Sequence, residues 1–547
     1  MEYSTSLGSG QLLLAPIGSA PEPIVLSPKL SGWQKIYIGF FVTESYIHTD
    51  NYLYLKLSDE DLYTPIRFMK KGMPEMWKTH EYFQEVFFKC ADITDLKLIL
   101  SKPQVAAPAL SGIAWIRCEE MSEAEIERYK NSLQKDNKCV QMHIDIDSFA
   151  DDISPEKSEC FSKLDMLKNT NADFCSLEYS MLFEDHGETA FDSTFVDITP
   201  SVHCSGTYSF EEIFKKYLAR SEKIGVPLYA TERMSVANFH FPINCPTLHN
   251  SFVPDNPQLH CKNRDGSDTL ICSYAYSQVQ DFVISRMIKM VKLGFKGISM
   301  ILHRGIHVGF EAPVLERFKT LYPDTDPRLL PVSDERLHSV WCEIMTEFIR
   351  KLRKTLDSIS GEHIMLNAIT DYGLESAKNF GLDIEQWARE GLIDSVSQAD
   401  MELYEDLTDC MDDKAPNIID LEKYKQQFAK RQVICRHYGT DVDKVCAHIP
   451  EFKALEEKYG IKVYHVLPWV HTVAPEEYMD AVEQMKRCGA ERFLAWNTNH
   501  MMPNRPEFLL ASSIGNDIGV DTQLRSFYRV LSLDGVDISQ FVPNWRG

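Results

Sequence analysis

Eight short apolar runs, each followed by a segment with helical periodicity, constrain the fold of this chain most. A strand followed by a helix, repeated along the chain, is typical of a parallel sheet covered by helices. Eight such units favour closure into a barrel. The sequence therefore predicts an α/β protein with a (β/α)8 TIM barrel. The predicted strands lie at residues 139–146, 172–179, 225–232, 294–303, 362–369, 392–398, 460–469 and 490–497.

The register of these units is supported by glycines that stop the intervening helices. Gly294, Gly460 and Gly489 mark the boundary between a helical segment and the predicted strand that follows it, as expected where a helix ends and a strand begins. A long amphipathic segment at 341–358 is typical of a helix that coats a barrel. Strand seven is ambiguous, because 432–439 could replace 461–468. We prefer 461–468, which has a clear helical pattern on each side.

Residues before and after the predicted barrel differ from it in composition and in the pattern of apolar residues. Residues 1–30 are rich in Gly, Ser and Pro and look like a flexible lead-in. Residues 31–118 hold short runs with alternating aromatic and β-branched side chains, which predict a small antiparallel β-sandwich. A linking helix begins after Ser122, and we assign residues 119–512 to the barrel. Residues 513–547 form a C-terminal extension, with a hairpin at 534–535, packed on the barrel or the sandwich.

Composition excludes several classes of function. The net charge of −23 argues against binding to nucleic acid or to an anionic membrane, which needs a basic surface. No apolar run is long enough to span a membrane, and the N-terminus lacks the charge pattern of a signal peptide. The 14 cysteines are scattered singly, and several, such as Cys175, Cys272, Cys342 and Cys435, fall in elements expected to be buried. We therefore expect reduced thiols in a cytoplasmic protein.

Candidate functional residues are sought where the barrel strands end, because reactive groups of such barrels lie at the carboxyl ends of strands and in the loops after them. Many carboxylates, histidines and aromatic residues follow these ends. Paired carboxylates are needed for glycoside cleavage, and aromatic faces provide platforms for sugar rings. Any single residue of this kind can also be structural. His143 is deep enough for a core histidine, and Glu232 beside Arg233 could be a plain ion pair.

Motifs for other chemistries are absent. The chain has no G-x-x-x-x-G-K-[ST], no G-x-G-x-x-G after a strand, no H-E-x-x-H and no G-x-S-x-G. The absence of these motifs argues against a nucleotide-binding protein, a zinc protease or an α/β-hydrolase. We expect no cofactor and no dedicated metal site.

Five short elements of the chain lie at Arg264–Gly266, Ser273–Tyr276, Arg304–Gly305, Glu311–Pro313 and Asp326–Arg328. They resemble elements of a known group, the bacterial glycosyl-hydrolase-like TIM-barrel proteins related to glycoside hydrolase family 10-like domains. The resemblance covers most of the chain beyond residue 30 and is densest at 260–400. The resemblance implies a glycosidase-like barrel with an N-terminal β-sandwich. One departure is that strand four ends in His303 and Arg304, where many barrel glycosidases place an acidic proton donor.

Our sequence-based hypothesis is a glycoside hydrolase that acts on a neutral or weakly charged glycoside. Glu311 is the predicted general acid or acid/base, and Glu232 or Asp371 is the second carboxylate. Arg304 would fix the ionisation of Glu311 or bind substrate, and Asp145 and Asp147 would bind hydroxyls or a cation. The remaining predicted substrate-binding residues are His303, Glu178, Tyr274, Tyr276, His465, Trp469, Trp496 and Asn497.

Two alternatives stay open at this point. One is a metal-dependent sugar isomerase or lyase on the same barrel, with His303, His465, Glu232 and Asp145 as ligands. The other is a non-catalytic protein that binds carbohydrate at the barrel mouth. The sequence also leaves open whether a hydrolase would invert or retain configuration, because this depends on the distance between the two carboxyl groups.

Overall fold

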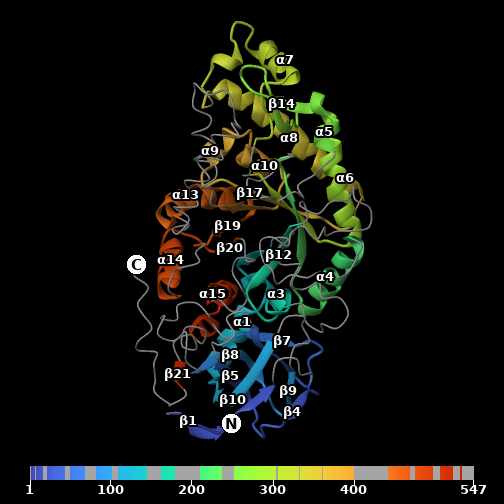
Figure 1. The fold of residues 1–547 in the computed structure, drawn as a ribbon. Helices are drawn as coiled ribbons and strands as arrows, with labels where there is room; N and C mark the ends of the chain where they lie inside the picture. Colours follow the sequence, from blue (N-terminus) through green and yellow to red (C-terminus); the bar gives the residue numbers. More distant parts are fainter. Residues whose placement is uncertain are drawn as a thin grey trace.

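A computed structural model shows a β-sandwich at one end, a closed barrel in the middle, and further helices with a small hairpin at the other end (Figure 1). The described residues are 2–5, 8–15, 21–42, 50–67, 82–101, 109–144, 162–178, 210–236, 252–302, 306–331, 333–359, 361–399, 441–468, 475–496, 506–521 and 530–532.

The eight predicted strands form one closed parallel barrel in chain order, which confirms the predicted fold class. Strand seven is the segment that we preferred, because β19 pairs with β18 on one side and β20 on the other. The competing segment, 432–439, lies outside the described residues. The barrel strands are β11 Val140–Ile144, β12 Ala172–Glu178, β13 Leu228–Arg233, β16 Gly297–Ile301, β17 Met365–Thr370, β18 Ser395–Gln398, β19 Lys462–Val466 and β20 Phe493–Ala495.

Helices cover the outside of this barrel. The long helix α8 buries an apolar face that includes Trp341, Phe348 and Leu352. Gly294 and Gly460 end α6 and α13 with φ of 120° and 72°, values that an L side chain rarely adopts. The helices in and around the barrel are α3 Ser162–Asp165, α4 Phe210–Ile224, α5 Phe252–Asp255, α6 Ser277–Leu293, α7 Ala312–Leu321, α8 Glu335–Ile359, α9 Leu374–Lys378, α10 Ile384–Arg389, α13 Val442–Tyr459, α14 Pro475–Arg487 and α15 Pro506–Ser513, with the short 3-10 turns η4 Pro257–Leu259 and η5 Pro327–Leu329.

A two-stranded hairpin, β14 His260–Lys262 and β15 Asp268–Cys272, stands apart from the barrel sheet. It comes from the segment between β13 and α6. It lies near α7 at the end of the molecule farthest from the sandwich (Figure 1). This hairpin was not predicted, and it determines where Glu311 lies.

The N-terminal domain is sandwich-like, as predicted. One layer contains β5, β8 and β10, the other contains β6, β7 and β9, and a short parallel pairing of β10 with β6 joins them. Ile38, Phe40, Leu55 and Leu100 are buried between the layers. The strands are β5 Trp33–Val42, β6 Asp50–Leu57, β7 Thr64–Arg67, β8 Tyr82–Asp92, β9 Leu98–Ser101 and β10 Ala109–Glu120.

Both ends of the chain add strands to this domain. Residues 1–30, which look like a flexible lead-in by composition, contain β1 Glu2–Thr5, β2 Gly8–Gln11, β3 Leu13–Ala15 and β4 Ile24–Leu26. Of these, β3 pairs with β10 and β4 with β9. The C-terminal strand β21, Val530–Ser532, pairs with β8. The described part of the C-terminal extension therefore joins the sandwich, and the predicted hairpin at 534–535 lies outside the described residues.

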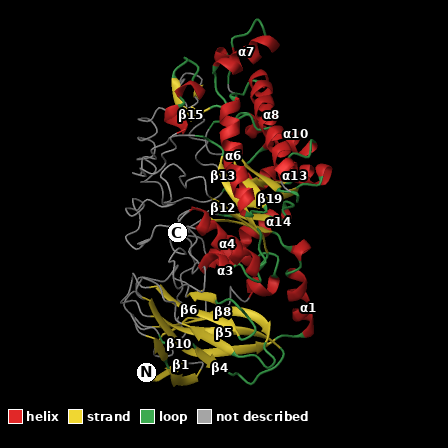
Figure 2. Ribbon diagram, turned by 90° about the vertical axis from the view of Figure 1, so that its right-hand side faces the viewer, coloured by secondary structure: helices red, strands yellow, loops and turns green. Residues whose placement is uncertain are grey.

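The predicted linking helix is α1, Glu123–Ser132, followed by a 3-10 turn, η2 Lys135–Asn137. Ser122 caps it, and Glu125 returns a hydrogen bond to the Ser122 backbone, which completes a capping box. Figure 2 shows α1 beside the junction of the sandwich and the barrel. An ion pair crosses this junction, because Glu60 of the sandwich, which also binds Lys89 of β8 at 2.7 Å, binds Lys168 of the barrel at 3.1 Å.

The described cysteines are all free, and Cys175, Cys272 and Cys342 are buried, as predicted. Cys435 lies outside the described residues. Among the helices that the structure describes, none is long and apolar enough to cross a membrane.

Candidate functional site

The direction of each barrel side chain is fixed by contacts that cross the interior. The Ser397 hydroxyl of β18 donates to Gln141 of β11 at 2.5 Å, although these strands are not neighbours in the barrel. Gln141 also binds Ser176 of β12 at 3.1 Å. Because successive side chains of a strand point to opposite faces, residues two positions further along also face inward. This places His143 and Glu178 inside the barrel.

The interior changes in character along the barrel axis. At the amino ends of the strands the rings of Phe174 and Tyr229 stack with centroids 4.1 Å apart. Gly297 makes room for them, because a Cβ there would lie 2.8 Å from the Tyr229 ring. Polar side chains such as Gln141 and Ser397 form the next level. Charged groups come last, at the carboxyl ends, where barrel enzymes carry out their chemistry.

The charged level contains His143, Glu178 and Arg233, with Trp496 directly after β20. Arg233 Nε donates to the Glu178 carboxylate, and His143 Nε2 lies 3.8 Å from the other Glu178 oxygen. The imidazole of His143 stacks on Trp496 with ring centroids 4.0 Å apart. His143 and Glu178 are fully buried, and Arg233 keeps 17% of its side chain exposed. These four residues, brought together from four strands, are the candidate site.

Glu232, a predicted catalytic carboxylate, points the other way. Its neighbour Arg233 faces the interior, so Glu232 faces the helices outside. Arg286 of α6 binds it there, with Nε 3.3 Å from a carboxylate oxygen. The structure therefore places Glu232 in a strand-to-helix ion pair, the structural role that the sequence had left equally open.

Glu311, the predicted general acid, lies fully buried at the N-cap of α7. Its carboxylate accepts hydrogen bonds from the Ser273 hydroxyl and from the backbone N–H groups of Gly309 and Lys262. Lys262 ends β14, so Glu311 ties the hairpin to the start of α7. Burial raises the pKa of Glu311 in spite of these hydrogen bonds. Glu311 is thus bound to a hairpin that stands apart from the barrel sheet, away from the charged level of the barrel interior, and its hydrogen bonds are those of a structural carboxylate.

Asp371 follows β17 directly, at the carboxyl end of the barrel. One oxygen accepts from the Tyr372 N–H at 2.7 Å, and the other accepts from the Ser376 hydroxyl at 2.8 Å. Burial raises its pKa, while Ser376, Tyr372, Lys444 and His448 act in the opposite direction. It remains partly exposed. Asp371 is thus a carboxyl group at the predicted edge with an elevated pKa.

Three predicted substrate-binding residues are placed away from the charged level. Tyr274 is completely buried, and its hydroxyl donates to the Met234 carbonyl at 2.6 Å. Tyr276 is the N-cap of α6 and is partly exposed. His465 faces outward, where its Nδ1 lies 2.8 Å from the Gln398 side-chain oxygen, and burial lowers its pKa to about 3.

The other predicted site residues lie outside the described residues. They are Asp145, Asp147, His303, Arg304, Trp469 and Asn497. Arg233 was noted in the sequence only as a neighbour of Glu232. The period-two alternation Tyr229, Thr231, Arg233 could have identified it as the inward-facing member of that pair.

The metal-dependent alternative loses two of its four ligands. Glu232 on β13 and His465 on β19 both face outward, and these strands lie on opposite sides of the barrel. They cannot bind one ion. Within the described ranges, no group of three or more His, Cys, Asp or Glu side chains has the arrangement of a metal site.

Comparison with known proteins finds no matching family model and no matching curated protein. The resemblance to the family 10-like group therefore remains a prediction. Among solved structures, the β-amylase catalytic domain from Paenibacillus polymyxa is 10% identical, with a TM-score of 0.39, and the match covers 71% of this chain and 98% of that one.

Two further similar structures are the C-terminal domain of a putative chitinase from Desulfitobacterium hafniense and the glycoside hydrolase domain of PelA from Pseudomonas aeruginosa. The first is 9% identical over 71% of this chain and 99% of that one, with a TM-score of 0.35. The second is 8% identical over 60% and 83%, with a TM-score of 0.28.

Proposed function

We propose that this protein is a glycoside hydrolase whose reaction centre lies at the carboxyl ends of the barrel strands, with Glu178 as one of its two carboxylates. The observation that supports this is the buried Glu178–Arg233 ion pair beside His143. A fully buried charge is expensive unless a partner compensates it. The Glu178–Arg233 pair lies at the carboxyl ends of the strands, where barrel enzymes carry out their chemistry. This position favours a functional role of the pair over a purely structural one.

The second carboxylate in this proposal is Asp371. Glycoside hydrolysis needs one carboxyl group that can donate a proton and one carboxylate that acts as nucleophile or base. Burial raises the pKa of Asp371, which suits a proton donor. Glu178, paired with a guanidinium, suits the ionised partner. This division of roles keeps Asp371, one of the two candidates that the sequence offered for the second carboxylate, and puts Glu178 in place of Glu311 and Glu232.

The substrate in this proposal is a neutral or weakly charged glycoside. The inward cation Arg233 is already paired with Glu178, so it offers little attraction to an anionic sugar. The second carboxyl, Asp371, is uncharged in its role as proton donor, so it does not attract an anionic sugar either.

The test compares three variants on a panel of aryl glycosides and oligosaccharides, with release of the aglycone or of reducing ends as the readout. Glu178→Gln and Asp371→Asn should each lower kcat/KM by about 100-fold or more, the usual contribution of an acid, base or nucleophile. Glu232→Gln is the matched control, because it removes a carboxylate on the neighbouring strand that faces outward. Full activity of Glu178→Gln would refute the proposal, whereas sugar binding without turnover in the wild type would favour the non-catalytic alternative.

A further inference from the structure

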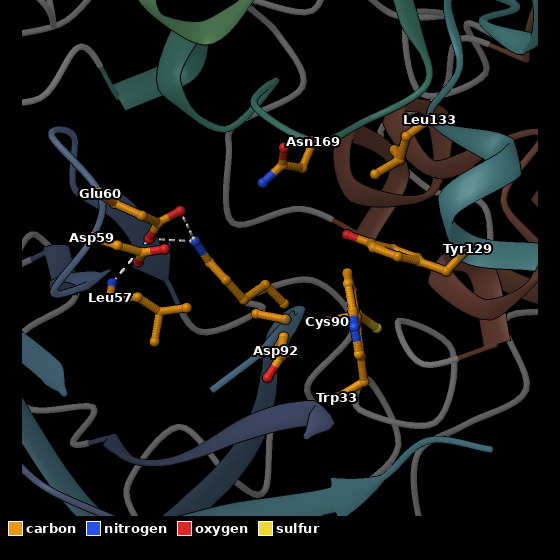
Figure 3. A pocket seen from close by; sticks show the side chains of 11 residues that line it. Trp33, Leu57, Asp59, Glu60, Cys90, Asp92, Tyr129, Leu133 and Asn169 are labelled. Atoms are coloured by element: carbon orange, nitrogen blue, oxygen red, sulfur yellow. Dashed lines mark hydrogen bonds and ion pairs between the residues drawn. The ribbon is translucent and has the colours of Figure 1, made fainter. Parts of the chain in front are cut away.

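A cavity of about 270 Å³ opens where the sandwich meets the barrel, far from the charged level (Figure 3). Its walls come from the sandwich, from α1 and from the turn before β12. Asn169 belongs to that turn, so the cavity lies at the amino ends of the barrel strands. The candidate reaction centre lies at the opposite, carboxyl ends. A ligand in this cavity would therefore occupy a second site.

The cavity has an apolar floor and a polar rim. Leu57, Cys90 and Tyr129 are buried at its floor. Trp33 is half-buried, and its ring meets Tyr129 edge to face, with centroids 5.9 Å apart. The rim is exposed and carries Asp59, Asp92 and Asn169. An apolar floor with a few polar groups at the rim is typical of sites that bind small molecules.

The charges of the lining disfavour an anionic ligand. Lys89 is the cation of the lining, and both oxygens of Glu60 lie 2.7 Å from its Nζ. Within the described ranges, Asp59 makes no hydrogen bond or ion pair, and only one oxygen of Asp92 is used, by Thr94. Ionised carboxylates can only accept hydrogen bonds. The lining therefore favours a ligand that donates hydrogen bonds and is uncharged, although Lys130 lies beside it with its Nζ 4.8 Å from the centroid of the Trp33 ring.

The size of the cavity limits the ligand further. At about 30 Å³ per water molecule, it has room for about nine waters. That is enough for a single sugar ring, with the rest of a longer glycan outside. A pyranose also offers an apolar C–H face to Trp33 and Tyr129 and hydroxyl donors to the rim.

We propose that this cavity is a second, non-catalytic binding site for one neutral sugar ring of a glycan. The choice of a sugar rests on the proposed function, whereas the charge and size of the ligand follow from the cavity alone. Because the two sites lie at opposite ends of the barrel, the cavity holds the protein on a long substrate and leaves the hydrolysis of a short one unaffected.

The test measures binding of neutral oligosaccharides by isothermal titration calorimetry, with the full chain carrying Glu178→Gln so that no ligand is consumed. Asp59→Ala removes two rim acceptors from an exposed residue and should weaken binding about threefold to tenfold. Asn169→Gly removes the rim amide and suits the positive φ of 59° at this position. Trp33→Ala removes the aromatic wall. The matched control is Asp61→Ala, which makes the same charge change in the same turn outside the cavity.

Binding that is weakened by Asp59→Ala and Asn169→Gly and unchanged by Asp61→Ala supports the second site. Absence of binding, equal binding by all these variants, or tighter binding of a uronic acid than of its neutral counterpart would overturn it. The proposed function is judged separately, by hydrolysis of a short aryl glycoside with residue 178 unchanged. Binding in the cavity without such hydrolysis would keep the second site and refute the hydrolase.

Discussion

Replacement of Glu311 by Gln separates a catalytic role from a structural one. If Glu311 were the catalytic acid, the Glu311→Gln variant would lose glycoside cleavage and keep the stability of the wild type. The structure leads us to expect the reverse, because the carboxylate is fully buried and accepts hydrogen bonds from Ser273, Gly309 and Lys262. Glutamine keeps one oxygen acceptor and turns an NH₂ group toward the donors that remain. At least one buried donor then loses its partner.

The cost of one buried, unsatisfied donor is about 1–3 kcal/mol. The unfolding entropy is about 2.1 cal/mol/K per residue, so for a barrel domain spanning 119–512 each kcal/mol lowers the midpoint of thermal unfolding by about 1 °C. We therefore expect a decrease of about 1–4 °C. The control is Glu316→Gln in the same helix, where the side chain is exposed and the midpoint should not change. Glycosidase activity measured below the unfolding range should be retained by both variants.

The pH dependence gives a second readout. Burial raises the pKa of Glu311 above its ordinary value, so the folded state holds this proton more tightly than the unfolded state does. Stability from this group is therefore fully present below about pH 4 and is lost as the pH rises through the raised pKa. Glutamine cannot titrate, so the variant should lack this loss. An unchanged unfolding midpoint together with abolished cleavage would refute the structural assignment of Glu311.

Other predictions concern the junction and the buried ionisable groups. Glu60→Gln should destabilise the protein by about 3 kcal/mol, because it leaves Lys89 buried without its carboxylate, and urea unfolding against a Lys56→Gln control would measure it. His307 and His465 have pKa values lowered by burial to about 4 and about 3, so neither ring should titrate by NMR between pH 5 and 8, and their contribution to stability should fall as the pH drops below about 6.5. Glu232→Gln should lower stability by breaking the pair with Arg286 while kcat/KM stays within about twofold; a large loss of activity would return Glu232 to the reaction.

The barrel could be predicted because each of its strands and helices leaves a recognisable pattern within a short stretch of the sequence. Each strand is a short apolar run, and the glycine stops before β16, β19 and β20 mark where strands begin. The lead-in was harder, because its strands β3 and β4 are held by pairing with β10 and β9 and not by their own composition. Pairing between segments that lie far apart in the chain leaves little trace in a single sequence.

The site was predicted as an edge of the barrel, but not as a set of residues. A residue close in sequence to the end of a strand is expected near the mouth of the barrel. Only the period-two alternation of the strand indicates whether its side chain faces inward. Glu232 and Arg233 are neighbours in the chain, yet Arg233 faces the barrel interior and Glu232 faces the helices outside. Glu311 shows the limit of both rules, because its neighbours Ser273 and Lys262 come from a hairpin inserted between β13 and α6. A carboxylate in a loop after a strand is therefore a candidate only once the elements that cover that loop are known.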